Sequence, residues 1–205
     1  NRVSITENDI VCDLPCPMEV GLWFDHHEGN LEELEYRQID LDALPGRFAV
    51  EPSCARVVYD HFKDEHAFQE HFEPLVAETD IIDAFDYSSV DEWRQETPGK
   101  IIDATIRVQE ERPEQKWQYL RQLVSHIKTF PLERIAQMPS VKQRYRQYRE
   151  EESRMLEQIE RDITFLEQDT LKQVVIIDMT HHNRRPFVAK NLAYLLFPEA
   201  LAVIE

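Results

Sequence analysis

Glycine, cysteine and long apolar stretches are all scarce in this chain of 205 residues. Its four glycines form no glycine-rich phosphate loop and no Gly-x-Ser-x-Gly segment that would carry a nucleophilic serine. The three cysteines contain no Cys-x-x-Cys pair, and their odd number without a secretory signal favours reduced thiols in a cytoplasmic protein. No apolar run approaches the roughly 18 residues of a membrane-spanning helix, so no membrane partner is expected.

Basic residues are also in the minority, with 23 Lys and Arg against 40 Asp and Glu and a net charge of −17. Such a surface repels a polyanion at long range, which argues against binding to extended duplex nucleic acid. A small phosphorylated substrate stays compatible with this charge if a metal ion or local arginines supply positive charge. The length suffices for one good-sized domain, or for one domain and part of another.

The first part of the chain predicts an α/β domain with a parallel sheet. Residues 8–15 and 20–25 are short, largely apolar and end in charged residues, as strands do. A helix is expected over residues 52–63, with Pro52 and Ser53 at its start. Helical spacing of apolar residues then continues to an acidic turn at 78–88. We assign residues 1–138 to this domain.

A long connecting helix is expected over residues 139–169, beginning with Ser140 as its N-cap. Its apolar stripe consists of Val141, Tyr145, Tyr148, Met155, Ile159, Ile163 and Leu166. Residues 170–205 then give a strand at 174–179, a loop, a helix at 187–197 and a strand at 200–204. This order predicts the beginning of a second α/β substrate-binding domain.

Charged side chains follow both strands that are predicted near the N-terminus. Asp13 ends the first, and Asp25, His26 and His27 end the second. In a parallel sheet these residues would meet at the carboxyl edge, where open α/β sheets place their functional side chains. Residues 14–19 are a short crossover, feasible only between short strands. A hairpin, the alternative, would place the two groups at opposite ends.

Carboxylate and imidazole ligands together suit a divalent first-row ion such as manganese. One carboxylate that bridges two such ions, about 3.5–4 Å apart, makes a site for in-line attack on phosphorus. On residue types alone, a triplet such as Asp25-His26-His27 is more often an exposed turn than a metal site.

The sequence around this triplet resembles that of a known family. LWFDHH at 22–27 resembles the signature of the DHH phosphoesterases, and NDIVCDLP at 8–15 is similar to the family's second motif. PSCARVVYDHF at 52–62 is similar to the helix after the triplet, and ETDIIDAFDY at 78–87 lies where the fourth motif is expected. Together with LLFPEA at 195–200, the sequence LWFDHH most resembles the exopolyphosphatase-related branch of this family.

The resemblance implies a role for each matching residue. Asp13 would bridge two metal ions and His26 would ligate one of them. The expected catalytic residues are His27, which would face the scissile phosphate, and Asp25, which would orient the neighbouring histidine. Asp80 is the favoured fourth-motif ligand, with Asp83 as its rival, although a helix-ending acidic turn would explain both.

Two parts of the family pattern are missing from the sequence. The family's first Asp-x-Asp motif should precede Asp13 by dozens of residues, yet only twelve precede it here. Asp40-Leu41-Asp42 matches the Asp-x-Asp pattern, but it lies after the triplet and not before Asp13. We therefore interpret it as a surface loop. The late GGGH segment is also absent. We therefore expect an internal piece of a longer protein, with a degenerate relative as the alternative.

The loop before the last helix is a second candidate site. His182, Arg184 and Arg185 precede a helix that starts near Pro186, where arginines and helix-end amides could hold a phosphate. A polar connecting loop is the alternative interpretation.

The prediction is a phosphoesterase that hydrolyses a phosphodiester or phosphoanhydride with two Mn²⁺ ions, Mg²⁺ being the alternative cofactor. Its substrate would be a short oligonucleotide, a cyclic dinucleotide or polyphosphate, and a homodimer is left open. A non-catalytic relative that binds a phosphate ligand or a protein is the competing function.

Overall fold

The computed structural model describes residues 4–66, 68–108, 112–182, 188–189 and 191–204. The chain forms two compact units, Asn1–Asp86 and Tyr87–Glu205. The domain boundaries that the sequence predicts near residues 138 and 169 remain predictions.

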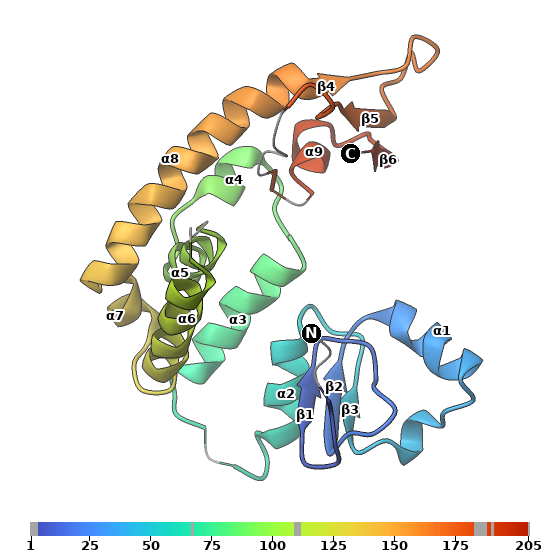
Figure 1. Ribbon diagram of the computed structural model, residues 1–205, viewed down its shortest axis with the longest axis vertical. Helices are drawn as coiled ribbons and strands as arrows, with labels where there is room; N and C mark the ends of the chain where they lie inside the picture. The colour runs from blue at the N-terminus through green and yellow to red at the C-terminus, as the bar shows by residue number, and fades with distance from the viewer. Residues whose placement is uncertain (1–3, 67, 109–111, 183–187, 190, 205) are drawn as a thin grey trace. The chain divides into compact units, whose positions relative to one another are not determined.

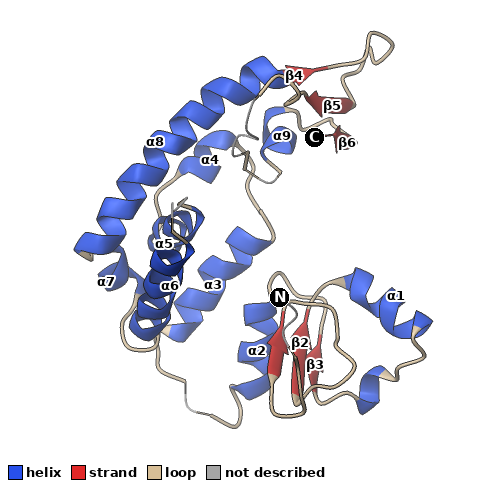
Figure 2. Ribbon diagram, viewed as in Figure 1, coloured by secondary structure: helices blue, strands red, loops and turns tan. Residues whose placement is uncertain are grey.

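A parallel three-stranded sheet forms the centre of the first unit (Figures 1 and 2). Its strands are β1 (Ile10–Cys12), β2 (Leu22–Asp25) and β3 (Gly46–Phe48), in the order β1-β2-β3. The pairing of β1 with β2 is parallel, which confirms the predicted α/β class and excludes the hairpin alternative. The ends of β1 and β2 therefore lie at the same edge.

Successive residues of β2 face opposite sides of this sheet, as the two-residue period of a strand requires. Trp23 packs in a cluster with Val11 and with Leu34 of α1 (Glu28–Tyr36). Phe24 packs on the other side with residues of α2 (Cys54–Phe62). Gly46 begins β3 at a φ of +114°, and an added Cβ would lie 2.1 Å from the Trp23 carbonyl oxygen. Only glycine allows this close approach of β3 to β2.

Helix α2 confirms the helix predicted over residues 52–63. Ser53 is its N-cap, and its hydroxyl accepts a hydrogen bond of 3.1 Å from the backbone N–H of Arg56. The helix α3 (Phe72–Asp83) follows and packs against α2. Asp40 caps the short 3-10 helix η1 (Leu41–Ala43), and all of it is exposed, as predicted for this surface segment.

The second unit is mainly helical and ends in a small sheet. Its first helices are α4 (Val90–Arg94), α5 (Pro98–Arg107), α6 (Pro113–Ile127) and α7 (Leu132–Ala136). The long helix α8 (Pro139–Asp162) packs with α5 and α7. Two strands, β4 (Ile163–Thr164) and β5 (Val174–Ile177), come next, followed by α9 (Leu192–Leu196) and β6 (Ala202–Ile204).

The long helix differs from its prediction at both ends. It begins at Pro139 with Met138 as its N-cap, so Ser140 lies inside the first turn. It ends at Asp162, before the predicted end at residue 169, because Ile163 and Thr164 pair with β5 instead. Backbone pairing with a neighbouring strand has overridden the helical spacing of apolar residues.

The small sheet has the order β4-β5-β6, and β5 pairs in parallel with β6. This confirms the predicted succession of strand, loop, helix and strand. The antiparallel strand β4 was not predicted. Part of the predicted helix 187–197 lies outside the described residues, and α9 covers its second half. Within the described ranges, no helix is both long and apolar enough to cross a bilayer.

Truncation of the buried stripe of α8 should destabilise the second unit. Ile159 is 1% exposed and packs in a cluster with Met155 and Val175. We expect Ile159→Ala to lower the free energy of unfolding by about 2–4 kcal/mol, measured by urea unfolding. The exposed neighbour Glu160 provides the control, because Glu160→Ala removes no buried contact. Equal stability of the two variants would contradict the packing of this stripe.

Candidate metal centre

Asp13 directly follows β1 and has a left-handed backbone conformation. Its φ is +61°, which aspartate tolerates better than most residues. Its N–H donates a 3.0 Å hydrogen bond to the carbonyl oxygen of Phe24, so the residue is still attached to β2. Unusual backbone conformations held by the surrounding structure are concentrated at functional sites. The carboxylate of Asp13 is half exposed at this edge.

Asp25, the last residue of β2, is a fully buried carboxylate with several hydrogen-bond donors. Its Oδ1 accepts from the backbone N–H groups of His26 at 2.8 Å and His27 at 3.3 Å. It also accepts from Nδ1 of His27 at 2.9 Å, and the Asn30 side chain donates to Oδ2. Burial raises the pKa of Asp25, but these hydrogen bonds outweigh it and lower the pKa below its ordinary value. Asp25 therefore stays charged and fixes the turn after β2.

His27 is oriented by Asp25. The hydrogen bond to this carboxylate raises the pKa of His27 above its ordinary value, against the opposing effect of burial. Nearby Asp13 and Asp83 add to the increase. Because Nδ1 is bound to Asp25, Nε2 is the nitrogen with which His27 can donate a further hydrogen bond.

The orientation of His26 leaves its second nitrogen facing two carboxylates. Nδ1 lies 2.8 Å from the carbonyl oxygen of Glu51, which can only accept, so Nδ1 carries the proton. Nε2 is buried, has no hydrogen-bond partner and presents a lone pair. It lies 3.3 Å from Oδ1 of Asp13 and 3.4 Å from Oδ2 of Asp83. Two carboxylates and an imidazole nitrogen this close repel one another unless a proton on the ring or a metal cation lies among them.

These residues fit a divalent metal ion. Two donors that bind one ion at about 2.1 Å are roughly 3.0–3.4 Å apart, close to the separations around His26 Nε2. Asp13, His26 and His27 also offer ligand atoms that all lie within 4.8 Å of one another. Carboxylate and imidazole donors without a thiolate suit manganese.

The two candidates for the fourth-motif ligand, Asp80 and Asp83, have different neighbours. Asp80 accepts hydrogen bonds from Ser53 Oγ at 2.7 Å and from Arg56 Nη2 at 2.6 Å, and so holds the start of α2 to α3. Asp83, the rival, ends α3 and lies beside His26. Asp83 is therefore the one of the two that lies beside His26, whereas Asp80 is paired with an arginine.

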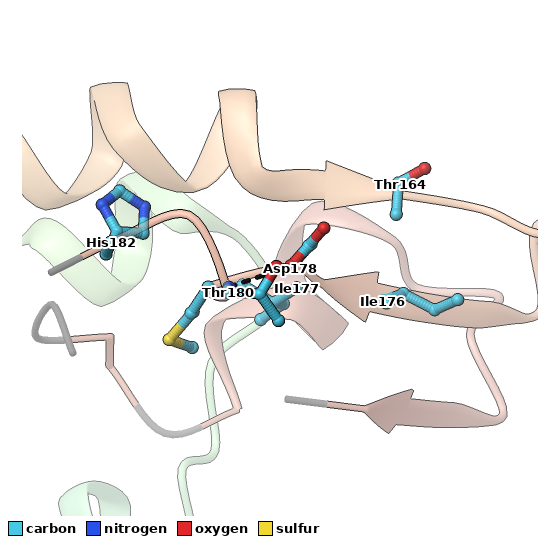
Figure 3. Close-up of a pocket in the computed structure, with 7 residues that line it drawn as sticks. Thr164, Ile176, Ile177, Asp178, Thr180 and His182 are labelled. Atoms are coloured by element: carbon cyan, nitrogen blue, oxygen red, sulfur yellow. Dashed lines mark hydrogen bonds between the residues drawn. The ribbon is translucent and has the colours of Figure 1, made fainter. Parts of the chain in front are cut away.

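The second group of predicted residues falls in the other unit. Arg184 and Arg185 lie outside the described residues. His182 lines an open hollow of about 510 Å³, together with side chains from β4, β5 and the loop after β5 (Figure 3). Its Nε2 lies 2.7 Å from a carboxylate oxygen of Asp162. Sequence reasoning did not single out Asp162, although it interrupts the apolar stripe of α8.

No protein-family model matches the sequence, and no curated protein matches it. Among solved structures, the fold is similar to that of a pGpG-specific phosphodiesterase, PggH, from Vibrio cholerae, with a TM-score of 0.66 and 24% sequence identity. The match covers 97% of this chain and 62% of that one, so this chain spans about three fifths of the neighbour's length. The fold is thus similar to that of a protein named as a phosphodiesterase, and this match does not support the exopolyphosphatase-related branch.

The two aspartates of α3 provide a matched test of the centre. Asp83→Asn should weaken Mn²⁺ binding by about tenfold or more, because it removes a charged oxygen ligand beside His26. Asp80→Asn should leave this affinity within about threefold, since Asp80 binds Arg56 instead. Calorimetric titration of both variants measures the difference. If Asp80→Asn has the larger effect, the assignment of Asp83 is wrong.

Proposed function

We propose that this chain is the metal-binding part of a DHH-type phosphoesterase that hydrolyses a phosphodiester bond in a short linear oligonucleotide. The observation that carries the proposal is the buried Nε2 of His26, which faces Asp13 and Asp83 without a hydrogen-bond partner. The similarity in fold to a protein named as a pGpG-specific phosphodiesterase supports the type of bond and the size of the substrate.

Asp13, His26 and Asp83 would hold a manganese ion, with Mg²⁺ as the alternative. A bound divalent ion supplies positive charge for phosphate oxygens and lowers the pKa of a coordinated water. The three residues account for one ion, so the second ion of the proposed pair needs ligands beyond this set. The metal charge would also offset the acidity of the chain, which otherwise repels a phosphorylated substrate.

His27 would act on the substrate and not on the metal. Its Nδ1 donates to Asp25, and the raised pKa favours the protonated ring, so Nε2–H is available to a phosphate oxygen. A hydrogen bond of this kind stabilises the charge that develops during attack on phosphorus. Asp25 would position His27 and keep Nδ1 as a donor.

A linear dinucleotide fits this proposal better than polyphosphate does, because the structural similarity is to a phosphodiesterase. Such a substrate carries few charges, so the chain's net charge of −17 opposes its approach only weakly.

The test compares substrates with the full-length protein. We expect pGpG and other linear dinucleotides to be cleaved when Mn²⁺ is present, and cleavage to stop when EDTA is added. Polyphosphate in the same assay should be cleaved more slowly. Product release is followed by chromatography, with Mn²⁺ and Mg²⁺ in parallel reactions. Tight binding of dinucleotides without any cleavage would favour the non-catalytic relative and overturn the proposal.

A further inference from the structure

A second group of histidines and a carboxylate lies in the second unit. Asp162 is the last residue of α8 and is 5% exposed. Its Oδ1 lies 3.1 Å from Nε2 of His181, and its Oδ2 lies 2.7 Å from Nε2 of His182. Their ligand atoms all lie within 4.8 Å of one another. One buried carboxylate thus faces two imidazoles.

Hydrogen bonds at the end of β5 determine where the two histidines lie. The N–H of Asp178 donates to the carbonyl oxygen of Asp162 at 2.8 Å, which connects β5 to the end of α8. Oδ1 of Asp178 accepts from the N–H of Thr180 at 2.9 Å and from its hydroxyl at 2.6 Å, and this closes a tight turn (Figure 3). The turn directs the following residues, His181 and His182, towards Asp162.

The position of Asp162 on its helix is unusual. It follows Met155 and Ile159 at helical spacing, so it lies on the face that packs into the core of this unit. A buried carboxylate is costly unless a partner compensates its charge. The two histidines, which are separated from it in sequence by the strands β4 and β5, are the partners that the fold provides.

We propose that Asp162, His181 and His182 form a second metal site, which binds a zinc-like divalent ion. Two imidazole nitrogens and one carboxylate oxygen are a donor set that zinc accepts, with the fourth position left to water. The 3.1 Å separation from His181 is near that of ligands that share one ion, whereas the 2.7 Å separation from His182 is that of a direct hydrogen bond and would widen by a few tenths of an ångström around an ion. His181 is 57% exposed on its side chain, which gives an ion access from solvent.

A neighbouring amide supports this arrangement. The side-chain amide nitrogen of Gln158, one turn before Asp162 on α8, lies 3.1 Å from Nδ1 and 2.9 Å from Nε2 of His182. When Nε2 of His182 binds a metal, Nδ1 carries the proton, and the Gln158 amide can rotate to accept it. Such a partner behind a metal-bound histidine fixes the orientation of the ring.

The site shares no residue with the proposed phosphoesterase centre of the first unit. Its metal would bind whether or not the chain cleaves phosphodiesters, so the two proposals succeed or fail separately. Without a metal, Asp162 forms hydrogen-bonded ion pairs with His181 and His182. The experiment must distinguish these ion pairs from a metal site.

The experiment measures Zn²⁺ binding by calorimetry in the tag-free chain of 205 residues. His26→Ala serves as the background, because it removes the central ligand of the first cluster. We expect this protein to bind one zinc ion, and the further change His181→Ala to weaken that binding by about tenfold or more. His181→Ala should preserve the fold, since the ring is largely exposed, and circular dichroism checks this. His66→Ala, which changes another exposed histidine, is the matched control and should leave zinc affinity unchanged.

The location of the ion is tested independently of affinity. Crystals of the His26→Ala protein soaked in Zn²⁺ should give an anomalous peak among Asp162, His181 and His182. Absence of zinc binding in the His26→Ala protein would overturn the proposal. Equal affinity with and without His181, or a peak only elsewhere, would also overturn it and leave an ion pair as the role of the cluster.

Discussion

Replacing His27 with alanine should lower the turnover of a dinucleotide by about a hundredfold or more, because it removes a positioned donor to the phosphate. Manganese affinity should stay within a few fold, since Nδ1 of His27 is bound to Asp25 and Nε2 of His26 is the nitrogen that faces Asp13 and Asp83. Steady-state kinetics with the full-length protein, together with calorimetry of Mn²⁺ binding, measures both quantities.

His26→Ala provides the matched comparison within the same pair of histidines. It should weaken manganese binding by about tenfold or more and lose activity for that reason, so that added Mn²⁺ restores part of the rate. Added Mn²⁺ should restore nothing in His27→Ala. A rate that is unchanged by His27→Ala would keep the enzyme but remove His27 from its mechanism.

Replacing Asp25 with alanine should cost about 3 kcal/mol or more of stability, because each buried donor that loses its acceptor costs about 1–3 kcal/mol. The backbone N–H groups of His26 and His27, and the side chains of His27 and Asn30, all lose their acceptor at once. Urea unfolding followed by the fluorescence of Trp23, which is 1% exposed in the same unit, reports the change.

Asp25→Asn separates the hydrogen bonds from the charge. The amide oxygen can still accept from the two backbone N–H groups, so this variant should lose less stability than Asp25→Ala. It should also lower the pKa of His27, whose increase depends mainly on the hydrogen bond to this carboxylate. NMR titration of the His27 ring measures that pKa. If Asp25→Ala is as stable as the original protein, the side chain is not a buried acceptor.

Much of the fold could be predicted because the relevant patterns are local. The apolar runs that became β1 and β2 end in charges, and Ser53 caps α2 in the way its sequence indicates. Short elements were missed. Helix α1 (Glu28–Tyr36) is rich in glutamate and buries only Leu34, so its pattern of apolar residues is weak. Strand β3 has three residues, and its pairing with β2 comes from tertiary packing.

The sequence indicated which residues would meet at the edge of the first sheet but not how each is paired. Asp80 and Asp83 lie one turn apart on the same helix, so spacing alone cannot decide between them. Their surroundings differ because Arg56 binds Asp80, whereas the end of the helix brings Asp83 to His26. The contact of Asp162 with His182 could not be predicted from the sequence either, because it depends on how the loop after β5 turns back to α8.

The short connection between β1 and β2 has a consequence for the order of folding. Ile10 pairs with Leu22, so little loop-closure entropy is lost when this ladder forms. Contacts between residues near in sequence generally form faster than distant ones. Asp13 and His26 should therefore come together early, whereas Asp83 arrives only when α3 docks. The centre would be completed late, and a metal that needs all three ligands would bind only after α3 has docked.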